Sequence, residues 1–198
     1  MVNEKNIKAE IASAQGRTIY IYYQGNIDTP RVNAIAGIVT NIITNNKPYA
    51  LYFLFSSHGG EVDAGITLYN FLKSLSVKII MHNIGTIDSI ANVIFMAGEE
   101  RYASPHTIFL FHGVSMNVNG SLSLPGINEL RNRILNNHNT IAGIICGNTK
   151  MKEAMIKKLF NQGETKDVNF ALKFGIINKI KPPKIPQNST IVTININN

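Results

Sequence analysis

Cysteine, tryptophan and charge are scarce in this sequence of 198 residues. The single cysteine, Cys146, excludes an internal disulfide, and its apolar neighbours favour a packed core thiol over a nucleophile. Zinc ligands of other types are not clustered near it, so neither a metal site nor a cofactor is expected. With 16% charged and 44% hydrophobic residues, the chain has the composition of one globular domain with a sizeable core.

Long apolar runs and nucleotide-binding motifs are also absent. No run reaches the roughly 18 residues of a membrane span, and the polar leader 1–16 has no apolar core of signal-peptide type. We therefore expect a cytoplasmic protein that does not associate with a membrane. No segment follows the pattern GxxxxGK[ST], so any dependence on ATP would come from a separate protein.

The net charge of +7 is concentrated towards the C-terminus. Nine lysines and three acidic residues lie between Lys150 and Lys184, which leaves the rest of the chain nearly neutral. Basic and aromatic residues do not alternate as they do on surfaces that stack bases and contact phosphates. This region is interpreted as a solvated helix face or a docking surface for an acidic partner, and no nucleic-acid partner is expected.

Strand-like and helix-like segments alternate three times in the first half, which indicates an α/β domain with a largely parallel sheet. Strands are predicted at 17–24, 49–55, 77–82 and 107–111, and helices at 29–43, 64–75 and 89–97. A turn is predicted at Asn83–Gly85.

The second half begins with a loop rich in glycine, serine and asparagine, residues 113–124. A polar helix at 127–145 has few apolar positions and is predicted to project as an arm. Two helices, at 152–160 and 168–174, and a strand at 175–180 follow. In the C-terminal tail 181–198, three prolines precede a last run, residues 189–198, that is expected to pair as an edge strand or to stay irregular.

Residues that could take part in catalysis follow three of the predicted strands. The first strand end is Ser56-Ser57-His58-Gly59-Gly60, whose glycines let backbone N–H groups approach a developing negative charge. At the second, Ser89 begins an apolar helix and is either a helix cap or a nucleophile. At the third, His112 follows the apolar strand TIFLF. Because the carboxyl ends of parallel strands meet at one edge of a sheet, these parts are expected to form one site.

Residues 17–180 resemble the proteolytic subunit of the Clp protease and the related Clp-like and phage head-maturation peptidases. The resemblance is carried by Phe55–Gly65 (oxyanion loop), Gly85–Ala91 (nucleophile segment), Met96–Gly98 with Arg101, Tyr102 and Pro105, Ile108–His112, and Ala171–Ile177. It implies a ClpP/crotonase-like fold of repeated ββα units. It also implies a projecting handle at about 113–150, between a polar leader (1–16) and a C-terminal tail (181–198).

The same resemblance implies a serine endopeptidase that hydrolyses unfolded polypeptides inside a homo-oligomeric ring, fed by a separate ATP-dependent unfoldase. Ser89 would be the nucleophile, His112 the general base, and the N–H groups of Gly60 and Ile90 the oxyanion hole. The sequence departs from the family pattern at three positions. His58 replaces the usual proline, Asp88 replaces a small residue, and Gly163 stands where the third triad member, an aspartate, is usual.

Glu164 is predicted as the third triad member because it needs only a one-residue shift, with Asp167 and Asn161 as alternatives. Two other functions stay open. The first is a catalytically silent structural subunit of a Clp-like ring, favoured by the missing aspartate. The second is a crotonase-type acyl-CoA enzyme, which leaves Ser89 and His112 without a role.

Overall fold

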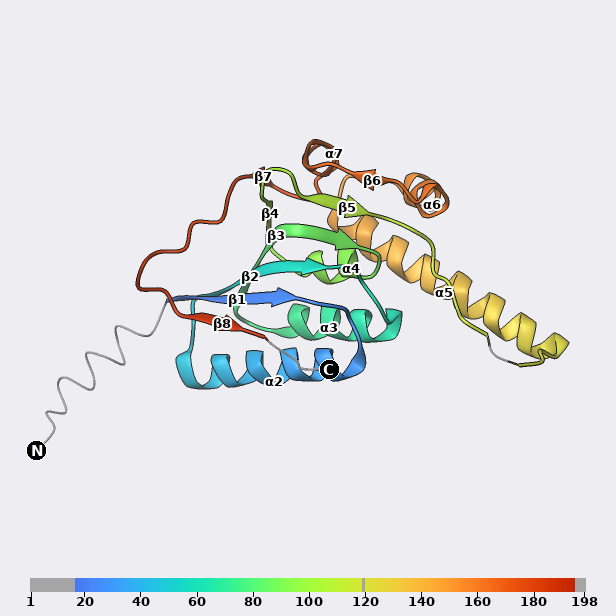
Figure 1. Ribbon diagram of the computed structural model, residues 1–198, viewed down its shortest axis with the longest axis horizontal. Helices are drawn as coiled ribbons and strands as arrows, with labels where there is room; N and C mark the ends of the chain where they lie inside the picture. The colour runs from blue at the N-terminus through green and yellow to red at the C-terminus, as the bar shows by residue number, and fades with distance from the viewer. Residues whose placement is uncertain (1–16, 119, 195–198) are drawn as a thin grey trace, which may run out of the picture.

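A largely parallel sheet organises the chain in the computed structural model, which describes residues 17–118 and 120–194 (Figure 1). Its strands are β1 (Thr18–Gln24), β2 (Ala50–Ser57), β3 (Lys78–Asp88), β4 (Glu100–Ala103), β5 (Ile108–Leu110), β6 (Thr165–Lys166), β7 (Lys179–Ile180) and β8 (Ile191–Thr193). Their order is β6-β5-β3-β2-β1-β8, with β4 beside β3 and β7. All described pairs are parallel except β5 with β6.

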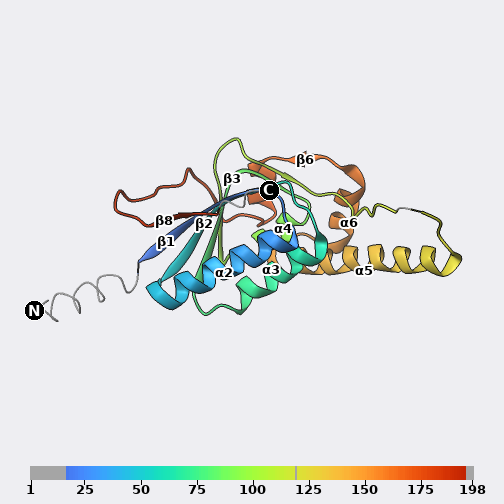
Figure 2. The same ribbon diagram turned by 60° about the horizontal axis from the view of Figure 1, so that its bottom comes forward.

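The helices are α2 (Thr29–Asn46), α3 (Val62–Ser74), α4 (Ala91–Phe95), α5 (Leu124–Asn148), α6 (Glu153–Gln162) and α7 (Val168–Lys173). Helix α2 begins where the Asp28 side chain accepts a hydrogen bond from the N–H of Arg31, and Pro30 occupies its first turn. Helices α2 and α3 lie side by side on one face of the sheet (Figures 1 and 2). Strand β2 is buried at every position, which explains its continuous apolar run.

The predicted mixed α/β fold is confirmed, and one local prediction is wrong. The chain does not turn at Asn83–Gly85, because β3 continues to Asp88 and changes partners along its length. Strand β2 pairs with β3 as far as Ile87, whereas β4 pairs with residues 80–83 and β5 with residues 86–88. The side chain of Asn83 stabilises this change by accepting from Gly85 N–H and donating to the carbonyl of Ile108.

Of the two arrangements expected for the C-terminal tail, an edge strand or an irregular segment, the structure shows the edge strand. Residues 191–193 form β8, a parallel edge strand beside β1, so the tail pairs with the sheet. Of the strand predicted at 175–180, only the last two residues pair, as β7. The helix predicted at 89–97 is also shorter and consists of α4 alone. The leader 1–16 lies outside the described residues. Among the described residues, no helix is long and apolar enough to cross a membrane.

Helix α5 projects from the body, as predicted (Figures 1 and 2). Its buried residues Ile141, Ala142 and Ile145 all lie in its C-terminal half. Cys146 is partly buried against the core, and burial raises the pKa of its thiol. The N-terminal half of α5 leaves Leu124, Ile127 and Leu135 exposed.

On the face of the sheet opposite α2 and α3, a histidine is buried among tyrosines. His82 is fully buried, its Nδ1 lies 2.6 Å from the hydroxyl oxygen of Tyr52, and its Nε2 lies 3.2 Å from Ser104 Oγ. Burial lowers its pKa from 6.5 to about 4. His82 is therefore held in its neutral form at neutral pH.

This depressed pKa predicts acid-sensitive stability. Between pH 6.5 and 4 the unfolded chain binds a proton at His82 that the folded chain does not, so stability is complete above pH 6.5 and is lost as the pH falls towards 4. We expect a loss of about 3 kcal/mol by pH 4. Urea unfolding followed by circular dichroism measures it. His82→Gln is the control and should lose this share of the pH dependence; an identical pH dependence in both proteins would contradict the prediction.

Candidate active site

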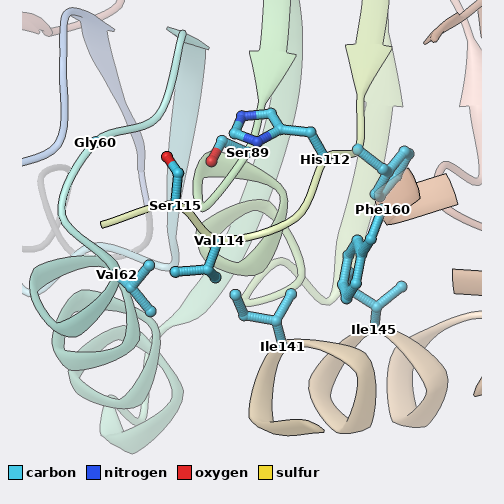
Figure 3. Close-up of a pocket in the computed structure, with 10 residues that line it drawn as sticks. Gly60, Val62, Ser89, His112, Val114, Ser115, Ile141, Ile145 and Phe160 are labelled. Carbon is cyan, nitrogen blue, oxygen red and sulfur yellow. The ribbon is translucent and has the colours of Figure 1, made fainter. Parts of the chain in front are cut away.

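The carboxyl ends of β2, β3 and β5 meet at one edge of the sheet, as expected. Ser89 follows β3, His112 follows β5, and the glycine pair follows β2. Ser89, His112 and Gly60 all line one pocket of about 80 Å³, together with residues of α3, α5 and α6 (Figure 3).

Ser89 occupies a strained turn. Its φ of 57° lies in the left-handed region, which few residues other than glycine adopt. Its N–H donates to the carbonyl of Leu110, which ties the turn to the end of β5. Within the described residues its hydroxyl makes no hydrogen bond, so Ser89 is not a capping residue, and Ile90 is the N-cap of α4.

The glycine pair lies directly against this turn. A Cβ atom on Gly59 would lie 2.6 Å from Ser89 Cβ and 2.8 Å from the carbonyl oxygen of Asp88, so only glycine fits there. Gly59 and Gly60 have φ values of 88° and 150°, which glycine alone adopts readily. The N–H groups of Gly60 and Ile90 have no hydrogen-bond partner among the described residues. They are therefore available to an oxyanion.

His112 is oriented by the backbone. Its Nδ1 lies 2.8 Å from the carbonyl oxygen of Gly113. Because a carbonyl oxygen can only accept, Nδ1 carries a proton, so in the neutral ring it is Nε2 that has the lone pair. No hydrogen bond joins His112 to Ser89 in the described structure, although both line the same pocket (Figure 3).

A buried asparagine that the sequence analysis missed connects the serine turn to the histidine strand. Asn92 is fully buried, and its Nδ2 lies within 3.2 Å of the carbonyl oxygens of Ile87, Ser89 and Leu110. Its Oδ1 has no hydrogen-bond partner in the part of the chain that the structure describes. An asparagine one turn after a candidate nucleophile in an apolar helix was the available signal.

The segment after His112 is held by the two helices beside it. Gly113 N–H donates to the carbonyl of Phe160 on α6 at 3.0 Å, and Val114 N–H donates to His138 Nε2 on α5 at 2.8 Å. Burial lowers the pKa of His138, which favours the neutral ring that this contact requires. The backbone carbonyl that orients His112 therefore depends on the position of α5.

Glu164 is placed near the site but has another partner. It precedes β6, whose Thr165 pairs with Leu110, two residues before His112. Its carboxylate accepts from Lys166 Nζ at 2.7 Å and is 61% exposed, and this contact lowers its pKa. No hydrogen bond joins it to His112 within the described residues. Its role as third triad member stays a prediction.

Asp167 and Asn161, the two alternatives to Glu164 as third triad member, differ in their contacts. Asp167 caps α7 by accepting from the N–H of Phe170 at 2.8 Å, which lowers its pKa and gives it a structural role. Asn161 is exposed on α6 and has no contact with His112 among the described hydrogen bonds. Among the described residues, no three His, Cys, Asp or Glu side chains gather in an arrangement that could hold a metal ion.

Comparison with known proteins gives a consistent result. A family model for Clp protease matches residues 3–184. ATP-dependent Clp protease proteolytic subunit 2 of Borreliella burgdorferi is 24% identical over 186 residues, covering 93% of this chain and 90% of the relative. The protein of the same description from Pseudomonas aeruginosa is 24% identical over 162 residues, covering 81% and 79%. A proteolytic subunit from Bigelowiella natans is 29% identical over 99 residues, about half of each chain.

Proposed function

The chain belongs to the Clp protease family, and from this premise we propose that it is a serine endopeptidase with Ser89 as nucleophile and His112 as general base. One observation carries the proposal. Ser89, His112 and Gly60 come from the ends of three different strands and line one pocket. A fold has no structural need to bring a strained serine, a histidine and unbonded N–H groups to the same place.

The geometry supports a complete acyl-transfer cycle. Ser89 Oγ attacks the substrate carbonyl carbon while Nε2 of His112 takes the hydroxyl proton. The resulting oxyanion accepts hydrogen bonds from the N–H groups of Gly60 and Ile90. His112 then gives its proton to the leaving amine as the C–N bond breaks. A water molecule hydrolyses the acyl-enzyme by the same steps, which returns Ser89 to its starting form.

We propose that the carbonyl oxygen of Gly113 orients His112 in place of a carboxylate. The observed Nδ1 contact of 2.8 Å fixes the tautomer that the mechanism needs. Glu164 remains the candidate suggested by the sequence, since it flanks the strand that pairs with β5. A neutral acceptor stabilises the imidazolium less than a carboxylate does, so a modest catalytic rate is expected.

The substrates and partners follow from the family. We propose that the chain assembles as a homo-oligomeric ring, hydrolyses unfolded polypeptides inside it, and receives them from a separate ATP-dependent unfoldase. The names of the relatives in Borreliella burgdorferi and Pseudomonas aeruginosa, which describe ATP-dependent proteolytic subunits, support this proposal. The exposed apolar residues of α5 provide a surface for contacts between subunits.

Labelling with a fluorophosphonate tests the proposal. Attack by Ser89 Oγ forms an O–P bond and expels fluoride, so we expect one label per chain at Ser89, located by peptide mass spectrometry. Ser89→Ala should stay unlabelled. Glu164→Gln should be labelled at the wild-type rate, because Gly113 already supplies the acceptor for Nδ1. A rate at least 100-fold lower would assign the third position to Glu164, as the sequence predicts.

The alternative function has its own outcome in the same experiment. A folded, oligomeric wild-type protein that takes up no label would contradict the peptidase assignment. It would favour the silent structural subunit, for which the missing aspartate at Gly163 is the supporting observation.

A further inference from the structure

The glycine pair and the serine turn are tied together by very few interactions. The β2–β3 ladder shifts register after Phe55 and ends at the pair Ser57–Ile87. Beyond it, the carbonyl of Gly59 accepts from Ile27 N–H at 2.8 Å, and Gly59 N–H donates to Ser57 Oγ at 3.1 Å. These bonds hold the glycine pair on the side away from Ser89.

A single side-chain contact links the glycine pair to the serine turn. His58 Nδ1 donates to Asp88 Oδ2 at 2.9 Å, and among the described residues this is the only side-chain hydrogen bond between segments 57–60 and 87–90, beyond the last ladder pair Ser57–Ile87. Each partner is the immediate neighbour of a functional element: His58 precedes Gly59, and Asp88 precedes Ser89. His58 and Asp88, two of the positions at which this sequence differs from the usual family residues, are therefore in contact with each other.

The Asp88 side chain is fixed well enough to act as an anchor. It is only 11% exposed, and its second oxygen, Oδ1, accepts from Thr86 Oγ1 at 2.5 Å. The His58 ring is 78% exposed, so little else restrains it. A nearly buried carboxylate thus holds an exposed imidazole and, through it, the backbone that leads into Gly59.

From this geometry we infer that the His58–Asp88 pair positions the oxyanion hole, by fixing the Gly60 N–H relative to Ser89 and Ile90. The inference rests on the proposed peptidase function. Two consecutive glycines with positive φ have no side chains to hold them; the backbone bridge to Ile27 restrains them on one side, and the His58–Asp88 contact links them to the serine turn on the other. Neither His58 nor Asp88 needs to contact the substrate, which makes them positioning residues.

A positioning role predicts which kinetic constant changes. Oxyanion-hole hydrogen bonds form with the charge that develops in the transition state, so a misplaced N–H lowers kcat and leaves KM nearly unchanged. Displacement by about 1 Å costs on the order of 100-fold in rate. A role in substrate binding would instead raise KM.

The test compares His58→Ala, Asp88→Ala, the double variant and His58→Asn in the full-length protein. We expect each alanine variant to lower kcat about 10- to 100-fold with KM within about twofold. The double variant should be no slower than the slower single variant. His58→Asn should retain at least a third of wild-type kcat, because the asparagine Nδ2 can donate where the histidine Nδ1 does. Lys157→Ala, which breaks an exposed ion pair with Glu153 on α6, is the control and should keep wild-type kcat.

Amide hydrogen exchange separates failure of this inference from failure of the proposed function. In His58→Ala, we expect exchange at least tenfold faster than in wild type in peptides covering 57–61 and 87–91, whether or not the protein hydrolyses peptides. Unchanged exchange, wild-type kcat in His58→Ala, or a His58→Asn variant as slow as His58→Ala would each overturn the inference. An inactive wild type whose exchange still responds to His58→Ala would contradict the peptidase assignment alone.

Discussion

Ser89→Ala is expected to lower kcat for peptide hydrolysis by at least about 10⁴-fold while the fold and the assembly are retained. The variant deletes one oxygen that makes no hydrogen bond within the described residues and leaves the backbone contact from Ser89 N–H to Leu110 in place. The remaining rate would come from the oxyanion hole and from substrate binding. Hydrolysis of a fluorogenic peptide measures kcat, and circular dichroism with light scattering measures fold and mass.

The control for this prediction is Ser74→Ala, at the end of α3. This exposed serine donates to the carbonyl of Phe71 and lies away from the pocket, so wild-type hydrolysis is expected. Equal hydrolysis by wild type and Ser89→Ala would remove Ser89 from the mechanism.

Leu135→Glu is expected to dissociate the proposed homo-oligomeric ring. Leu135 is 43% exposed on the projecting half of α5, where a single chain offers it no core to pack against. A carboxylate buried at a subunit contact without a partner destabilises that contact strongly. Light scattering at micromolar concentration should show wild type at many times 21.9 kDa, and most of the variant in smaller species.

Loss of assembly should also lower hydrolysis by Leu135→Glu, although Ser89 is unchanged. Helix α5 holds the segment after His112 through the contact from Val114 N–H to His138 Nε2, so a displaced helix disturbs the carbonyl that accepts from His112 Nδ1. Asn136→Glu adds the same charge at the neighbouring exposed position and should leave the mass and the rate unchanged. A wild-type protein that scatters as a monomer of 21.9 kDa would contradict the ring proposal itself.

The sequence predicts elements well where a local pattern determines the structure. The apolar run 49–55 lies within or next to β2 because a strand covered on both faces needs apolar residues throughout. The same logic fails at Asn83–Gly85, where residues that usually form turns lie inside β3. Pairing with β4 on one stretch and β5 on the next decides that conformation, and no local pattern encodes the change of partner.

In the candidate site, the residues that come together could be predicted from the sequence, whereas the contacts that orient them could not. Ser89, His112 and Gly60 could be found because strand ends of a parallel sheet meet at one edge. The contacts that orient them could not be found. The acceptor for His112 Nδ1 is a backbone carbonyl, which any residue supplies, and the His58–Asp88 contact joins residues 30 positions apart. Side-chain partners of this kind depend on the register of distant strands.

Strand β8 has a consequence for how the molecule behaves among other copies of itself. The outer side of β1 would otherwise offer unpaired N–H and C=O groups along a tyrosine-rich strand, a ready template for intermolecular β-pairing and aggregation. Instead, Tyr20–Tyr22 pair with Ile191–Thr193, and further hydrogen bonds reach Thr190 and Ile194. Within the described residues β8 has only three residues, so it covers part of this sheet edge and presents only a short new edge itself.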